Sequence, residues 1–269
     1  MITTTTTIDP SPVPVAPRRG GVVRTTARVA ALELRLLLRE PGVLVWLIAF
    51  PAVTVLILAG VFGAEPDADF AGARPSEHYV VGYIGVVLAQ LGLVTLPGHL
   101  ASHRELGFLR RYRSAGVGGG TVVASQAVLG AVLGVSGAAI VLAVGGAVYG
   151  VPAPVDPVAV VGWLAAGTAC FIALGLALGA LMPSSRAANA VGNLLLIPMF
   201  LLGGGGPPRD VMPDAMRAVS DALPLTHVIG GLREAWLGTG AGPRTLWWPA
   251  AVATVAVVFA VRSARRRAG

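Results

Sequence analysis

Long hydrophobic stretches alternate with short polar segments along this chain of 269 residues. Six stretches contain no charged residue, and they are residues 43–64, 79–100, 121–151, 158–182, 187–206 and 245–261. A helix rises about 1.5 Å per residue and the hydrocarbon core of a bilayer is about 30 Å thick, so one span needs roughly 20 apolar residues. The pattern therefore predicts an all-α membrane protein with six transmembrane helices.

Arginines lie between the hydrophobic stretches and indicate the orientation of the chain. All 20 basic residues are arginine, and with the N-terminus inside the cell the cytoplasmic segments hold 15 of them. An excess of positive charge on the cytoplasmic side is the usual arrangement. Aromatic residues predict a belt at the outer interface, and its expected members are Tyr79, Tyr83, Tyr149, Trp163, Trp247 and Trp248. We expect a multi-pass protein of the plasma membrane with both termini in the cytoplasm.

The N-terminal region is polar, threonine-rich and proline-rich, without the apolar core of a signal peptide. We expect residues 1–27 to form a disordered tail and residues 28–269 to form one membrane domain.

Residues 28–40 have the pattern of an amphipathic helix on the inner membrane surface. At about 100° per residue, Arg28, Arg35 and Arg39 fall within a stripe roughly 40° wide, opposite an apolar arc. Such arginines bind lipid phosphates at the interface. The alternative is a simple extension of the first span, although Pro41 favours a break between the two.

The segment between the second and third spans is short, helix-capable and rich in arginine. Its central residues are Arg104, Glu105, Leu106, Gly107, Phe108, Leu109, Arg110 and Arg111. The charges alone are explained by an anchor that fixes topology. Apolar residues directed away from lipid would also suit docking of a cytoplasmic partner.

The segment between the fifth and sixth spans, residues 207–243, is too polar to cross a membrane and too patterned for a structureless loop. Residues 214–223 and 225–237 predict two short helices separated by Pro224. We expect a re-entrant or interfacial helical hairpin at the outer end.

Composition and missing residue types narrow the function. The chain is 55% hydrophobic and 12% charged, with a mean hydropathy of +0.76. Its net charge of +7 lies in separate bands, so nucleic acid is not an expected partner. The four histidines, His78, His99, His103 and His227, lack metal-ligand spacing, so we expect no metal site. Cys170 has no base nearby in the sequence, and no enzymatic function is predicted.

The source of energy is limited by two further absences. The predicted spans hold no carboxylate, which disfavours a proton- or sodium-driven carrier. The chain holds no lysine, and a P-loop needs one at the β- and γ-phosphates of ATP. Any pumping energy must therefore come from a partner that binds ATP and magnesium, with no cofactor on this chain.

Uncharged polar residues are the candidates for a substrate path. Gln90 and Thr95 lie in the second span, and Asn189 and Asn193 lie four residues apart in the fifth, so the two amides share a helix face. Hydrogen bonds between neighbouring helices would explain them equally well.

Several segments, in this order, resemble the type-2 ABC exporter permeases, particularly the drug- and antibiotic-efflux branch. Residues 33–42 are similar to the family's amphipathic helix before the first span, and residues 103–113 to its segment with an Arg-Glu-x-Gly core. The strongest match is Ile-Pro-Met-Phe-Leu-Leu-Gly-Gly-Gly-Gly-Pro over 197–207. It is followed by Met-Pro at 212–213, Leu-Pro-Leu-Thr at 223–226 and Leu-Arg at 232–233.

The resemblance implies a role for each segment. Residues Arg104 to Arg111 would form the coupling helix that seats in a separate cytoplasmic ABC ATPase. Pro198, Gly203, Pro207 and Pro224 would shape an outer gate. A second permease subunit, either a copy of this chain or a paralogue, would complete the transporter.

The sequence is compatible with more than one substrate class and with one other class of protein. A hydrophobic drug or antibiotic is the leading substrate class, with lipid or polysaccharide as the alternative. The rival class is a non-transporting membrane protein that assembles or anchors others.

Overall fold

The computed structural model describes residues 21–39, 42, 45, 49–63, 65–70, 72–108, 112, 114, 117–238 and 245–266, with backbone alone for 263–266. Helices, turns and short irregular segments make up these residues, and no strand occurs among them. The helices are α1 (Val22–Leu37), α3 (Phe50–Phe62), α4 (Pro75–Gln90), η3 (Leu91–Thr95), α5 (Leu96–Glu105), α7 (Gly119–Tyr149), α8 (Pro157–Leu181), α9 (Ser185–Leu202), α10 (Asp214–Ala222), α11 (Pro224–Leu237) and α12 (Trp247–Arg266), with short 3₁₀ turns at Ala68–Phe70 and Arg209–Val211.

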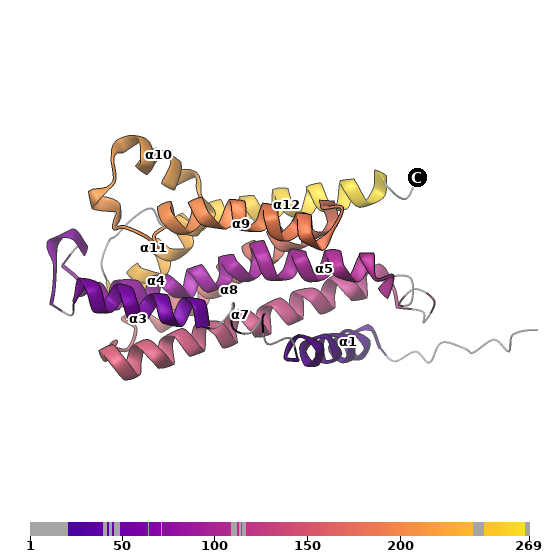
Figure 1. The fold of residues 1–269 in the computed structure, drawn as a ribbon, viewed down its shortest axis with the longest axis horizontal. Helices are drawn as coiled ribbons and strands as arrows, with labels where there is room; N and C mark the ends of the chain where they lie inside the picture. The colour runs from indigo at the N-terminus through magenta and orange to yellow at the C-terminus, as the bar shows by residue number, and fades with distance from the viewer. Residues whose placement is uncertain are drawn as a thin grey trace, which may run out of the picture.

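The helices form an elongated bundle with two distinct ends (Figure 1). The capped end carries α10 and α11. The arginine-rich end holds α1, the last turn of α5, the start of α9 and the end of α12, with Arg24, Arg28, Arg104, Arg186 and Arg262. Charge is therefore concentrated at the ends of an apolar body, as the hydrophobic pattern predicts.

Four stretches are long and apolar enough to cross a membrane. They are 68–105, which contains α4, η3 and α5, together with α7, α8 and α9. The described part of the first predicted span is α3, which has 13 residues, and the apolar part of α12 is also shorter than a full span. Length thus confirms the second to fifth predicted spans, and the six-span count stays a prediction.

Local sequence explains where the long helices begin. Asp156 accepts a hydrogen bond from the Ala159 amide at 2.9 Å, and Pro157 follows as the first residue of α8. Ser184 caps α9 in the same way, accepting from the Ala187 amide at 3.1 Å. These side chains satisfy amides that have no partner within the helix. The turn between α8 and α9 is consequently short and fixed.

The α4–η3–α5 stretch is the centre of the bundle, and α3, α7, α8 and α11 pack against α4. Tyr79 and Tyr83 are almost completely buried there. The prediction that these two tyrosines join an interfacial belt is therefore wrong, because α4 is covered on all sides. Trp247 is 63% exposed and keeps a position compatible with that belt.

The π-helical segment η3 (Leu91–Thr95) joins α4 to α5. A side chain at Gly92 would collide with the Phe171 carbonyl of α8, and one at Gly192 of α9 would collide with the Leu93 carbonyl. Glycine at both positions lets α8 and α9 approach the η3 backbone closely. Segments of π-helix often mark functional sites.

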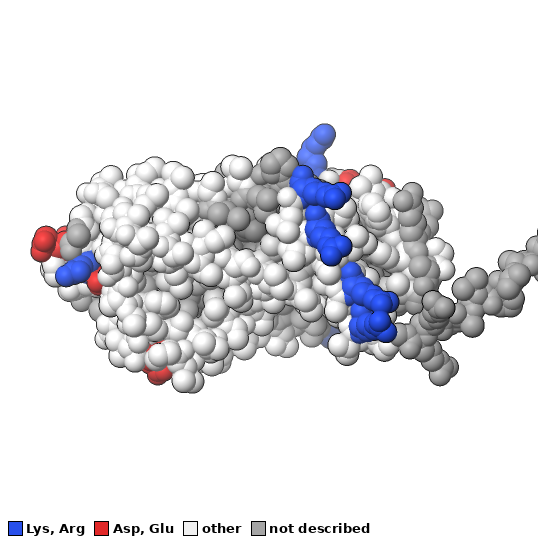
Figure 2. All heavy atoms as spheres, turned by 90° about the horizontal axis from the view of Figure 1, so that it is seen from below, with Lys and Arg blue, Asp and Glu red and all other residues white. Residues whose placement is uncertain are grey.

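The N-terminal helix begins at Val22, so the predicted boundary of the tail at residue 27 falls inside α1. It ends at Leu37, which favours a separate helix over an extension of the first span. Arg28, Arg35 and Arg39 are exposed, and Figure 2 shows a row of basic side chains across this side of the molecule. The opposite face packs on α7.

Candidate coupling site at the arginine-rich end

Arg104 joins the end of α5 to the end of α8. Its Nη1 donates to the Ala180 carbonyl at 2.6 Å, and its Nη2 donates to the Met182 carbonyl. Carbonyls at a helix C-terminus lack partners within the helix and carry the negative end of the helix dipole. A guanidinium is well suited to them, because its two parallel donors can bind two carbonyls at once.

Glu105 binds the beginning of the next helix. Ser185 Oγ donates to Glu105 Oε2 at 2.8 Å. Two consecutive residues of α5 thus hold both sides of the α8–α9 turn. The resemblance assigns Arg104 and Glu105 to the coupling helix, and in this structure both have partners within the chain.

The turn after α5 exposes an apolar residue. Gly107 has a φ of +71°, a conformation that glycine adopts without strain, and its amide bonds to the Arg104 carbonyl at 3.2 Å. Leu106 is 62% exposed, whereas the ring centroids of Phe108 and His103 are 5.3 Å apart. Leu109, Arg110 and Arg111 lie outside the described residues. The described start of the segment is a helix end and a turn, with Leu106 largely exposed.

A buried carboxyl beneath this turn was not predicted. Glu33 of α1 is fully buried and accepts a hydrogen bond from Gln126 Nε2 of α7. The Tyr112 hydroxyl donates to it at 3.5 Å, and His103 Nδ1 lies 3.7 Å from its Oε1. Burial raises the pKa of Glu33 to about 7, while the Tyr112 hydrogen bond acts in the opposite direction.

A signal for Glu33 was present in the sequence. Glu33 lies three residues after Ala30 and four before Leu37, the spacing of one helix face. An acidic residue in the apolar face of an amphipathic helix needs a buried partner. The periodicity could identify the residue, whereas its partners come from segments about 70 to 90 residues away in the sequence.

Together these contacts connect five parts of the chain at one end. Arg104, Glu105 and His103 lie on α5, Gln126 on α7, Glu33 on α1 and Tyr112 in the segment after α5, and Ala180 and Ser185 flank the α8–α9 turn. A force on the segment after α5 would reach α1, α7, α8 and α9 through direct contacts. Packed elements with hydrogen-bond networks are the physical means by which such coupling travels.

The predicted substrate-path residues do not share one surface. Gln90 is fully buried at the end of α4, and Thr95 is half-buried at the end of η3. Asn189 is exposed on α9, and Asn193 Nδ2 donates to the Asn189 carbonyl at 2.8 Å. The asparagines therefore remain candidates on one helix, separate from Gln90.

The predicted gate residues gather where α9 meets the hairpin of α10 and α11. Pro198 lies within α9, Gly203 ends that helix, Pro207 is exposed beyond it and Pro224 opens α11. The hairpin divides at Pro224, as the sequence predicts. Its second helix is buried along most of its length and packs on α4 and α8.

Hydrogen bonds hold this hairpin in place. Arg233 is buried and donates to the His78 carbonyl at 3.0 Å and the Gly204 carbonyl at 2.7 Å. Ser220 Oγ donates to the Leu202 carbonyl at 2.7 Å, so α10 is tied to the end of α9. These hydrogen bonds connect α4, the end of α9 and the hairpin at the capped end.

Comparison with known proteins assigns this architecture to a family. The family model described as ABC-2 type transporter matches residues 27–237, from α1 to the end of α11. The chain is 33% identical over 117 residues to the inner membrane transport permease YhhJ of Escherichia coli (strain K12), and equally to that of Shigella flexneri. The alignment covers 43% of this chain and 30% of the relatives' length.

This chain belongs to the ABC-2 type transporter family, as a membrane permease of that family. The matched residues include both the site around Arg104 and Glu33 and the hairpin of the capped end.

Proposed function

We propose that this protein is the membrane-spanning subunit of an ATP-driven exporter and that residues 104–111 receive the motion of a separate cytoplasmic ABC ATPase. The main support for this proposal is that contacts from several helices converge at the arginine-rich end. Arg104 and Glu105 bind the α8–α9 turn, and Glu33 binds α1 to α7 beneath the same segment.

The orientation follows from this assignment. The arginine-rich end faces the cytoplasm, six helices cross the plasma membrane, and both termini lie inside. ATP and magnesium bind the partner, since this chain has no lysine for a P-loop. Charge at the inner surface and an apolar body support the same arrangement.

A second permease subunit covers the exposed apolar faces of α3 and α9. Ile57 of α3 is 57% exposed and Ile197 of α9 is 58% exposed. Phe50 and Phe200 bring the two helices together, with ring centroids 6.4 Å apart. A hydrophobic drug- or antibiotic-like molecule would leave along this interface, past Asn189 and Asn193, and the gate at Pro198, Gly203, Pro207 and Pro224 would close it outside.

Purification from its own host cells tests the proposal. The full chain with an affinity tag should co-purify a P-loop ATPase, and the complex in vesicles should move a hydrophobic dye only with ATP and magnesium. ATP hydrolysis by the isolated chain, or transport without an ATPase, would contradict it.

A further inference from the structure

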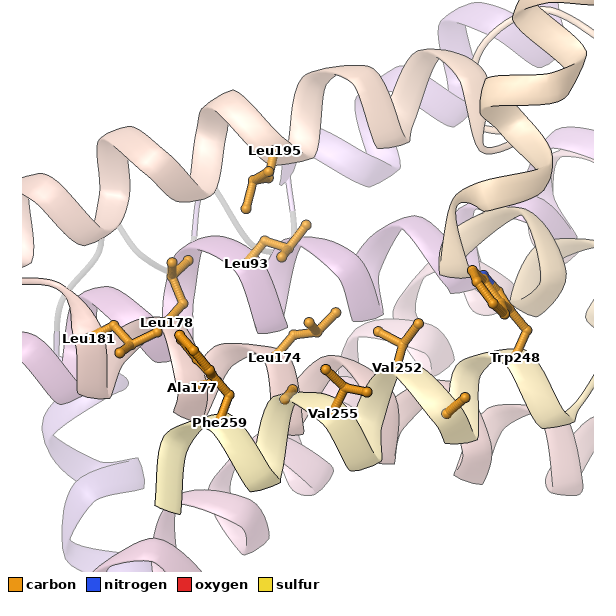
Figure 3. A pocket seen from close by; sticks show the side chains of 12 residues that line it. Leu93, Leu174, Ala177, Leu178, Leu181, Leu195, Trp248, Val252, Val255 and Phe259 are labelled. Atoms are coloured by element: carbon orange, nitrogen blue, oxygen red, sulfur yellow. The ribbon is translucent and has the colours of Figure 1, made fainter. Parts of the chain in front are cut away.

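A cavity of about 390 Å³ lies between α8, α9, α12 and the η3 segment. Figure 3 shows the side chains of the 12 residues that line it, all of them leucine, alanine, valine, phenylalanine or tryptophan. The volume lies in the range of ligand sites, about 300–1,000 Å³. Its walls offer no charge, so the cavity suits an occupant made of hydrocarbon.

The cavity is elongated along the helices. On α12 it extends from Trp248 to Phe259, about 16 Å at the rise of a helix. On α8 it extends from Leu174 to Leu181 in the same direction (Figure 3). In a membrane-spanning bundle this direction is close to the membrane normal, along which lipid tails also lie. A single alkyl chain has the matching shape.

Lipid has access to the cavity from the side. Val255 and Phe259 line it and are 68% and 56% exposed. An empty apolar groove loses the dispersion contacts of its walls, and water cannot replace them. The medium around the exposed residues of a spanning helix is hydrocarbon, so a lipid tail is the available occupant.

The two ends of the cavity differ. Trp248 closes one end and is fixed by a hydrogen bond from Nε1 to the Ala222 carbonyl, 3.1 Å long. Toward the other end, the cavity-lining residues Trp248, Val252, Val255 and Phe259 of α12 follow spacings of four, three and four. The next residue in that series is Arg262, which is exposed at the arginine-rich end. Guanidinium groups at the end of apolar clefts bind lipid phosphates.

We propose that the cavity between α8, α9 and α12 binds one acyl chain of an anionic bilayer phospholipid, with the headgroup phosphate at Arg262. The site does not depend on the transported substrate or on the ATPase, so it can be tested separately from the proposed function. A lipid in this position would separate α9 from α12 and support the close packing of α9 on η3.

The test uses the full chain in nanodiscs that contain phosphatidylglycerol with a photoreactive diazirine on one tail. After illumination, mass spectrometry should map labels to the lining residues of α8 and α12. Ala251→Phe fills the cavity, and labelling there should fall about tenfold, equivalent to about 1.4 kcal/mol of binding. The matched control is Val257→Phe, because Val257 is 49% exposed on the same helix and does not line the cavity.

The headgroup is tested in parallel. Phosphatidylcholine with the same tail should label the cavity less than phosphatidylglycerol, and Arg262→Gln should abolish this difference. The wild-type map decides the matter even if Ala251→Phe does not fold. Labels spread evenly over exposed residues such as Val257 and Val258 would overturn the acyl-chain site. Equal labelling by the two lipids in the wild-type chain would overturn the role of Arg262.

Discussion

The carboxyl of Glu33 on α1 accepts a hydrogen bond from the side-chain amide of Gln126 on α7, although 93 residues separate them. Both side chains are completely buried. This pair fixes the N-terminal helix to the bundle directly below the segment assigned to coupling.

Glu33 should make stability depend on pH. Burial raises its pKa from 4.5 to about 7. Between these pH values the unfolded chain loses the proton while the folded chain keeps it, so stability falls as pH rises from about 4.5 to about 7. At about 1.4 kcal/mol per pKa unit, the cost is at most about 3 kcal/mol.

Glu33→Gln should remove the Glu33 contribution, since glutamine does not titrate, so the difference in stability between the wild-type chain and Glu33→Gln should shrink as pH rises. The measurement is the thermal unfolding midpoint of the detergent-solubilised chain between pH 5 and 8. Glu105→Gln is the control, because Glu105 lies at the same end in an exposed hydrogen bond. A wild-type slope that persists in Glu33→Gln would assign the pH dependence to another group.

Arg104→Ala should loosen the α8–α9 turn. The change leaves the Ala180 and Met182 carbonyls without their donor, at a cost of about 1.5–3 kcal/mol for hydrogen bonds to a charged group. Arg104→Lys should restore only part of the loss, because lysine lacks the two parallel donors. Arg186→Ala at the same end serves as the control for charge, and equal midpoints in Arg104→Ala and Arg186→Ala would rule out a bridging role.

Asn193→Leu should change which substrates are exported and leave the folded yield close to normal. Asn193 is half-buried, and its amide donates to a carbonyl of its own helix, so the substitution removes a hydrogen bond within α9. The measurement compares efflux of a panel of hydrophobic dyes at matched membrane levels. Reduced folded yield with an unchanged dye profile would favour a purely structural role.

Cysteine labelling should report the orientation of the bundle. In a Cys170→Ala background, Val155→Cys and Val219→Cys at the capped end should react with an impermeant thiol reagent outside whole cells. Both positions are exposed, at 71% and 51%, whereas Ser76 and Ser220 at this end are buried. Arg186→Cys should react only after the cells are opened, and labelling of Arg186→Cys in intact cells would contradict the proposed topology.

Hydrophobic pattern and helix-breaking residues predicted most of the secondary structure. Pro224 separates α10 from α11 as predicted, because the effect of proline geometry is local. The end of α5 was harder to predict, because residues 102–105 continue the helix that precedes them. The charged sequence there does not indicate where the helix stops.

Tertiary contacts explain what the sequence did not predict. Tyr79 and Tyr83 have the composition of an interfacial belt and are nevertheless buried, because α11 and α3 cover α4. Arg104 resembles a residue that anchors topology, and its partners are carbonyls more than 70 residues away. Every residue has a backbone carbonyl, so the sequence does not show which carbonyls bind Arg104. The folded structure is needed to identify them.

We propose that residues 104–111 receive motion from an ATPase through an apolar contact. Leu106 is 62% exposed at the start of this segment, and Leu109 follows three residues later. Buried apolar anchors dominate interface energies, with losses of about 2 kcal/mol or more on truncation. Leu106→Ala with Leu109→Ala keeps every arginine that sets the orientation, so insertion should be normal.

The most direct measurement compares this double variant with Arg110→Gln plus Arg111→Gln at matched expression, scoring ATPase co-purification and ATP-dependent efflux. The leucine variant should lose both activities, and the arginine variant should retain most of each. Normal ATPase binding and efflux in the leucine variant would contradict the coupling assignment and leave the segment as a basic loop that only fixes topology.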